Sequence, residues 1–365
     1  MGSTTMRAVL SAALRRAAKD LLRLRDPALR PVLACVRAQL KFEPGRVMAI
    51  LRRPNVGAAV RVLREGPQPR LAGQLAATLA LELHFAGATL PALSFSGLPA
   101  RVACLGGGFA VPGGAKARLV EGRWSAGGVT VALGDPSDRP YHAVAPGLVL
   151  ATLDDNPLAM DEAHPDKSGN AVDLGGQGPD VWVTALKDAL QRIERYLPAI
   201  REEASLTLSQ FVPVGYDERK HLSASYAEAL GTIYLSLHPD PMTMTEAVIH
   251  ELSHNKLNAL MESGGLLENA FHPLFTSPVR PDPRPLHGVL LAVHAFLPVE
   301  ALYRAMAEAD DPISRRPGFS RRRAVVTEKN REGASVLLEH AEPTALGRGL
   351  LDEIRRLVAD PESAT

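Results

Sequence analysis

The predicted fold is centred on the stretch TMTEAVIHELSHNKLNALMESGG, residues 243–265. Thr243 with Glu246 three residues later forms a capping-box signature, which predicts the start of a helix. An apolar pattern of helical period continues to Met261, and the glycine pair at 264–265 is typical of a helix end. We therefore expect one helix over this stretch.

The predicted helix contains HELSH, residues 250–254, which is an HExxH motif. Side chains four residues apart on a helix lie one turn apart on one face, so His250 and His254 can bind a single metal ion. Glu251 stands nearby without sharing that position. Two helical histidines can also be packed and hydrogen-bonded without a metal, but the helical context and the strand expected before it favour a metal site.

Two protein ligands do not make a stable catalytic metal site, so a third must come from elsewhere and leave positions open for substrate. The next predicted helix, in PRPLHGVLLAVHAF, carries His287 and His294 seven residues apart on nearly the same face. Carboxylate alternatives are Glu268, in the loop after the motif helix, and Glu300, on another face of the later helix. We favour His294, with His287 close behind.

Two arginines, Arg280 and Arg284, approach this later helix in SPVRPDPRPLHG. An arginine held in a proline-rich segment is pre-organised to hold a carboxylate in a bidentate pair. The spacing alone fits a surface ion pair or a carbonyl-capping arginine equally well. As a binding site, the pair predicts an acidic cosubstrate.

The elements around the motif predict an α+β fold. A helix, two strands and then three helices are expected, at 179–200, at 205–214 and 231–238, and at 286–309, 321–341 and 345–358. They predict a mostly helical catalytic domain over 141–365, with a small sheet next to the HExxH helix in a zincin-like arrangement. GTIYLSLH at 231–238 reads as an edge strand, to which an extended peptide could add main-chain hydrogen bonds.

The first 140 residues read differently. Apolar positions recur at helical spacing from Met6 to about Leu40, with breaks near the prolines at 27 and 31. Short apolar runs between Gly and Pro clusters predict strands and tight turns over 71–133. The polar loop at 135–140 is the expected boundary, so 1–140 forms a mixed helical and β-rich N-terminal region.

Composition limits the classes of function. With 365 residues, 46% of them hydrophobic and 22% charged, the chain is globular and long enough for two domains. A formal net charge of +1 argues against broad nucleic-acid or membrane-surface binding. Cys35 and Cys104 are the two cysteines, and their spacing indicates neither a disulfide framework nor a zinc-thiolate site.

No export or membrane segment is indicated by the sequence. Arg15 and Arg16 interrupt the place where the apolar core of a signal peptide would continue. The most apolar stretch, 71–95, is broken by Gln, Glu and His, which is typical of a buried element. We expect a cytoplasmic protein.

HELSHNKLNAL, followed by RPDPRPLHGVLLAVHAF, resembles the HExxH-motif peptide-modifying family of ribosomal peptide natural-product (RiPP) pathways in bacteria. The resemblance covers about residues 141–340 and includes LATLDDNPLAM and GTIYLSLHP upstream of the motif. Members of the family are 2-oxoglutarate-dependent peptide β-hydroxylases, which use iron to hydroxylate a side-chain Cβ in a precursor peptide.

This resemblance implies that the chain is an Fe(II)- and 2-oxoglutarate-dependent dioxygenase that uses O₂ and acts on a precursor peptide. By position, His250 and His254 would bind iron, and Arg284 would hold the distal carboxylate of 2-oxoglutarate. Three protein ligands on an octahedral ion leave two positions for the keto acid and one for dioxygen. The N-terminal region is expected to bind the leader of the peptide or to form homodimer contacts.

Two other classes of function remain open. In a zinc peptidase, Glu251 would be the general base on a zinc-bound water, and His250 and His254 would be zinc ligands. In a non-catalytic peptide-binding module, the metal would be structural or lost. A closed four-ligand site using both His287 and His294 would favour that module.

Overall fold

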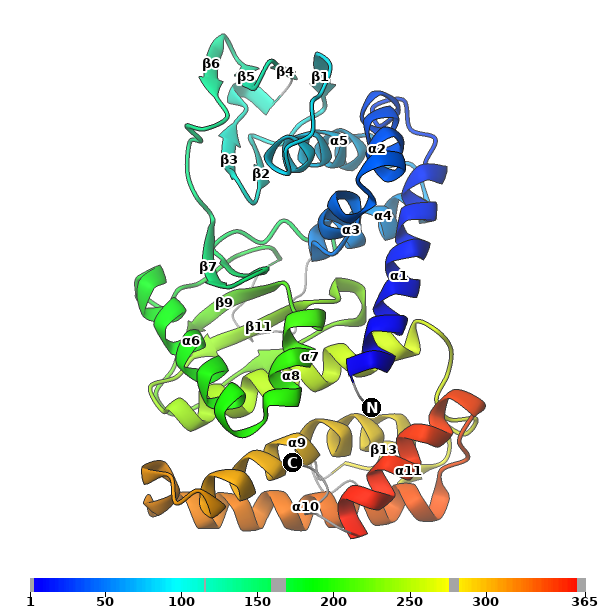
Figure 1. The fold of residues 1–365 in the computed structure, drawn as a ribbon, viewed down its shortest axis with the longest axis vertical. Helices are drawn as coiled ribbons and strands as arrows, with labels where there is room; N and C mark the ends of the chain where they lie inside the picture. The colour runs from blue at the N-terminus through cyan, green and yellow to red at the C-terminus, as the bar shows by residue number, and fades with distance from the viewer. Residues whose placement is uncertain (1–2, 115, 159–168, 276–281, 360–365) are drawn as a thin grey trace.

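The computed structural model describes residues 3–114, 116–158, 169–275 and 282–359, and Figure 1 shows their arrangement. The fold is α+β and mostly helical, as the sequence predicts. In Figure 1 the N-terminal part lies at the top, a sheet with its helices lies in the middle, and the C-terminal helices lie below.

Five helices form most of the N-terminal part: α1 (Ser3–Arg23), α2 (Arg30–Phe42), α3 (Pro44–Leu51), α4 (Pro54–Glu65) and α5 (Pro69–Phe85). The last four carry a proline in the first turn, where its missing N–H costs no helical hydrogen bond. The strands predicted from residue 71 are wrong for α5, a helix with eleven buried residues. A continuous apolar run has no period that separates a buried helix from a strand.

The predicted short strands are present from residue 93 onward. They are β1 (Leu93–Ser96), β2 (Arg101–Cys104), β3 (Gly107–Ala110), β4 (Lys116–Val120), β5 (Arg123–Ala126) and β6 (Val129–Ala132), with a 3-10 turn, η1, at Pro112–Gly114. β1, β4, β5 and β6 form an antiparallel sheet in that order, and β2 pairs with β3. The apolar core of this part ends at Leu133, and a second core begins at Val144.

A five-stranded mixed sheet organises the second half. It comprises β7 (Tyr141–Ala145), β8 (Leu148–Ala151), β9 (Gln210–Tyr216), β10 (Ser223–Ala224) and β11 (Thr232–Leu237), and its order is β10-β11-β9-β8-β7. β9 runs parallel to both β8 and β11, while the two outer pairs are antiparallel. The predicted edge strand at 231–238 is therefore wrong, because β10 covers the outer side of β11.

Helices α6 (Pro179–Tyr196), α7 (Pro198–Thr207) and α8 (Pro241–Met261) accompany this sheet, and a 3-10 turn, η2, lies at Ala227–Ala229. Pro198 divides the predicted 179–200 helix in two, and α7 continues to Thr207, so the following strand begins later than predicted. Side chains of α6 and α8 share one apolar core with those of β9 and β11. α8 thus packs directly against the sheet.

The C-terminal layer covers α8 from the other side. It contains α9 (Leu286–Glu308), α10 (Phe319–His340) and α11 (Ala345–Ala359), with η3 at Pro312–Arg315 and a two-stranded ladder of β12 (Leu274–Phe275) and β13 (Arg284–Pro285). α9 contacts both α8 and α10 (Figure 1). Among the described helices, α9 alone is long and apolar enough to cross a membrane, and 56% of its most apolar window is buried, as in the core helix of a soluble protein.

The start of α8 differs from the predicted capping box. Asp240 caps the helix, with its side chain accepting a hydrogen bond from the Met242 backbone N–H, and Pro241 occupies the first turn. Thr243 therefore lies inside the first turn, and Glu246 is free to bond elsewhere. The cap thus lies three residues earlier than predicted, and the HExxH residues remain helical.

Candidate metal centre and adjoining pocket

The two motif histidines face each other on α8. Their rings are perpendicular, with centroids 4.5 Å apart, and the Nε2 atoms of His250 and His254 lie 2.9 Å apart. Both Nδ1 atoms are buried and have no hydrogen-bond partner among the described residues. The spacing of four residues thus produces the convergent pair of ring nitrogens that the sequence predicts.

Burial keeps both rings neutral. It lowers the pKa of His250 to about 3, with His254 and Arg322 adding to the shift. It lowers the pKa of His254 to about 4. At neutral pH each ring therefore has one nitrogen with a free lone pair, which is the form that binds a metal ion.

The separation of the two Nε2 atoms tests the fit of an ion. Two imidazole nitrogens bonded at about 2.1 Å would lie about 3.0 Å apart at a right angle and about 3.4 Å apart at a tetrahedral angle. The observed 2.9 Å is the distance of a hydrogen bond between the two rings, and it brings both Nε2 atoms within reach of a single ion.

His294 lies on α9 at the contact with α8 and is 8% exposed. Burial lowers its pKa well below the usual value, and nearby Lys256 and His254 lower it further, while a hydrogen bond with the Ser253 backbone opposes the shift. Lys256 is itself held in a buried ion pair with Glu203. The packing of α9 on α8 therefore places His294 close enough to His254 for a charge on that ring to lower the pKa of His294.

The other predicted ligands point elsewhere. His287 packs against the ring of Phe271 at the start of α9, and burial lowers its pKa. Glu268 is exposed in the loop after α8. Glu300 accepts a 2.6 Å hydrogen bond from Asn330 of α10. Among the residues that the structure describes, no three His, Cys, Asp or Glu side chains converge as a metal set.

Of the two arginines predicted to bind a carboxylate, Arg280 lies outside the described residues. Arg284, in β13, has its Nη2 3.3 Å from the carboxylate of Asp282, and its stem passes Gly288. Its Nε is buried and has no partner among the described residues. Arg284 thus keeps an unsatisfied donor, although it does not line the pocket that begins at His250.

Glu251 is 2% exposed and bonded to the sheet. One carboxylate oxygen accepts a hydrogen bond from the Ser223 hydroxyl at 2.7 Å, and the other accepts one from the Ser225 hydroxyl at 2.6 Å. Burial raises the pKa of Glu251, and the two serine bonds oppose that shift. Ser223 lines the pocket described next, whereas Glu251 does not. The motif carboxylate therefore joins α8 to β10.

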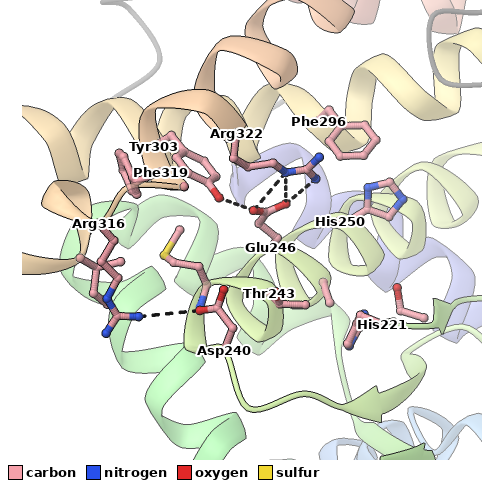
Figure 2. Close-up of a pocket in the computed structure, with 15 residues that line it drawn as sticks. His221, Asp240, Thr243, Glu246, His250, Phe296, Tyr303, Arg316, Phe319 and Arg322 are labelled. Carbon is pink, nitrogen blue, oxygen red and sulfur yellow. Dashed lines mark hydrogen bonds and ion pairs between the residues drawn. The ribbon is translucent and has the colours of Figure 1, made fainter. Parts of the chain in front are cut away.

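A pocket of about 640 Å³ opens beside His250. The N-terminal half of α8 forms its floor, and α9, η3 and the start of α10 form the opposite wall. Figure 2 shows His250 at one side of this pocket and Arg316 at the other. Its volume suits a ligand of the size of a small molecule or a short peptide segment.

The centre of the pocket holds three residues that sequence reasoning missed. The carboxylate of Glu246 accepts hydrogen bonds from the Tyr303 hydroxyl and from Nε and Nη2 of Arg322 (Figure 2). Arg322 also lies over the ring of Phe296, which contacts His250. Glu246 stands four residues before His250, so the helical period that identified the pair also places Glu246 on that face.

Comparison with known protein families and with curated proteins finds no match to this chain.

Proposed function

We propose that this chain is an Fe(II)- and 2-oxoglutarate-dependent dioxygenase that hydroxylates a side-chain Cβ in a ribosomally synthesised precursor peptide. The observation that carries the proposal is the neutral, convergent pair of His250 and His254 beside an open pocket. The proposal includes a cytoplasmic location and a role in a RiPP biosynthetic pathway.

The two motif histidines would hold iron through their Nε2 atoms. We favour His294 as the candidate third ligand, because a charge on His254 lowers the pKa of His294, which indicates that the two rings are near each other. His287 instead packs on the ring of Phe271. When bound, Fe(II) with 2-oxoglutarate and O₂ supplies the oxidising power to insert oxygen into an unactivated C–H bond. The protein's part is to orient the peptide and to exclude water from the inner end of the pocket.

Arg284 is the candidate for the distal carboxylate of 2-oxoglutarate. Its buried Nε has no partner among the described residues, and a buried unsatisfied guanidinium nitrogen is costly unless an anion completes its bonding. The stem of the Arg284 side chain lies over Gly288 of α9, the helix that also carries His294. Leu286, the first residue of α9, and His294 are about 12 Å apart along the helix axis.

In this mechanism Glu251 is a positioning residue. Its two serine bonds fix the rotation of α8 relative to β10, and so the direction of His250. A zinc peptidase is the second candidate, because burial raises the pKa of Glu251 toward the range of a general base. Against it, both carboxylate oxygens are already engaged and the group lies outside the pocket lining.

The decisive experiment is anaerobic reconstitution with Fe(II), followed by 2-oxoglutarate, while recording the weak visible charge-transfer band of a chelated keto acid. Arg284→Ala should weaken the band, whereas the matched control Arg348→Ala, at an exposed arginine on α11, should leave it unchanged. No band in the wild type, together with tightly bound zinc and cleavage of peptides, would refute the dioxygenase and favour the peptidase.

Glu251→Gln separates the two mechanisms further. As a positioning residue, its loss should lower turnover by about 100-fold at most, whereas loss of a general base costs about 10²- to 10⁴-fold. Metal content by elemental analysis should stay near that of the wild type in either case, so turnover alone decides.

A further inference from the structure

The outer end of the pocket is rich in arginine. Residues 315–323 hold five arginines in nine positions, while Lys and Arg together make up 41 of the 365 residues in the chain. Two of the five, Arg316 and Arg322, line the pocket, and we call these two the basic rim. A nearly neutral chain thus concentrates positive charge at one entrance.

The two arginines of the basic rim differ in how firmly they are held. Arg322 donates hydrogen bonds from Nε and Nη2 to the carboxylate of Glu246. These bonds fix the plane of the guanidinium group and neutralise part of its charge. Arg316 is 55% exposed at its side chain, and its nearest carboxylate oxygen, on Asp240, is 3.9 Å away. Asp240 meanwhile caps α8, so it is not free to follow the guanidinium. Arg316 therefore has donors available for an incoming carboxylate.

The flanking arginines add to the positive potential. Arg315 is paired with Asp310, but Arg321 and Arg323 make no ion pair with any carboxylate of the described residues. Clustered like charges beside a cleft attract an oppositely charged ligand and raise its association rate. In the pocket lining itself Arg322 is paired with Glu246, so the guanidinium that keeps donors for a ligand is that of Arg316, with Arg321 and Arg323 nearby in the chain.

We propose that the basic rim binds an acidic segment of the peptide substrate, with Arg316 as its principal contact. The inference rests on the proposed function for the identity of the peptide as a substrate, but not for its binding. Asp240, beside Arg316, and His250 are ten residues apart on α8, which is about 15 Å. An extended peptide covers that distance in four or five residues, which sets the spacing between its acidic residue and the residue at His250.

The test is a binding measurement without metal or cosubstrate. A fluorescein-labelled dodecapeptide with four central Asp residues is compared with its Asn counterpart by fluorescence anisotropy at low and physiological salt. The Asp peptide should bind at least tenfold more tightly, and the difference should shrink with salt. Arg316→Glu should weaken Asp-peptide binding about tenfold, and Arg316→Gln should weaken it less.

Arg348→Glu is the matched control, because it makes the same charge change at an exposed residue far along the chain on α11. It should change binding by less than about twofold. Equal losses in Arg316→Glu and Arg348→Glu, or equal affinity for the two peptides, would overturn the proposal. Tighter, Arg316-dependent binding of a single-stranded oligonucleotide of equal length would overturn it in favour of a nucleic acid.

The binding test of the basic rim and the test of the dioxygenase activity can succeed or fail independently. Arg316-dependent binding of acidic peptides without any hydroxylation would refute the dioxygenase and leave the basic rim intact. Hydroxylation of peptides whose binding depends neither on Arg316 nor on acidic residues would support the dioxygenase and refute the role of the basic rim.

Discussion

Removing both serines that hold Glu251 should destabilise the protein strongly. In Ser223→Ala/Ser225→Ala the carboxylate of Glu251 loses the two serine hydroxyl groups that donate to it, while remaining 2% exposed. A hydrogen bond to a charged group contributes about 1.5–3 kcal/mol, so the loss of two is worth about 3–6 kcal/mol. For a domain of this size, that lowers the melting temperature by about 10 °C.

The assay is thermal and urea unfolding of the wild type, the double variant and Ser320→Ala, an exposed serine at the start of α10 that serves as control. Adding Glu251→Gln to the double variant should restore part of the stability, because an uncharged amide costs less to bury than an unpaired carboxylate. Zinc affinity, measured by competition with a chelating dye, should fall in the double variant, since α8 loses its attachment to β10.

A melting temperature within about 2 °C of the control would refute this reasoning. It would mean that the serine bonds are replaced by water and that Glu251 does not orient the helix. A further loss of stability on adding Glu251→Gln would contradict the same argument, because it would assign the stabilisation to the charge itself.

Three other perturbations have defined outcomes. Glu82→Ala leaves buried Arg53 without its 2.6 Å ion-pair partner and should cost about 3–5 kcal/mol in urea unfolding. Gly347→Ala should cost about 2 kcal/mol or more by the same assay, because its Cβ would meet the Leu266 carbonyl oxygen at 1.9 Å. Burial and the charge of a neighbouring histidine lower the pKa of His221 to about 4, so the unfolded chain takes up its proton first as the pH falls. Stability should therefore fall between about pH 6.5 and 4, with His221 contributing at most about 3 kcal/mol beside the other buried histidines, and His221→Gln should remove that contribution from unfolding curves recorded across the range.

The local parts of the fold are predictable from the sequence, because they follow from short-range periodicity. The helix around the HExxH motif, the strand at 231–238 and the helices after it are all present. The failures have local causes as well. α5 is apolar on every side, which hides its period, and the two residues of β10 are too short to display a strand pattern.

The candidate site is predictable only where its residues share one helix. His250 and His254 are found from spacing alone, and Glu246 obeys the same spacing. The partner that fixes Glu246 is Arg322, 76 residues away, and the contact of His294 with the motif helix depends on how α9 packs. Such contacts between distant segments are set by tertiary packing, which no local pattern contains. The pairing of Arg322 with Glu246 therefore required the structure, whereas the third metal ligand stays a prediction.

The two walls of the pocket come from different segments of the chain, and this difference decides where substitutions can alter the pocket. Glu246 and His250 belong to α8, a helix packed on the sheet, whereas Arg316 follows η3 and Arg322 belongs to α10. A substitution at Arg316 changes the entrance of the pocket without removing a hydrogen bond to α8 among the described residues, whereas one at Arg322 removes the bonds to Glu246. The ligand preference of the pocket can thus be varied, in nature or by directed evolution, at exposed positions of the segment that contains Arg316.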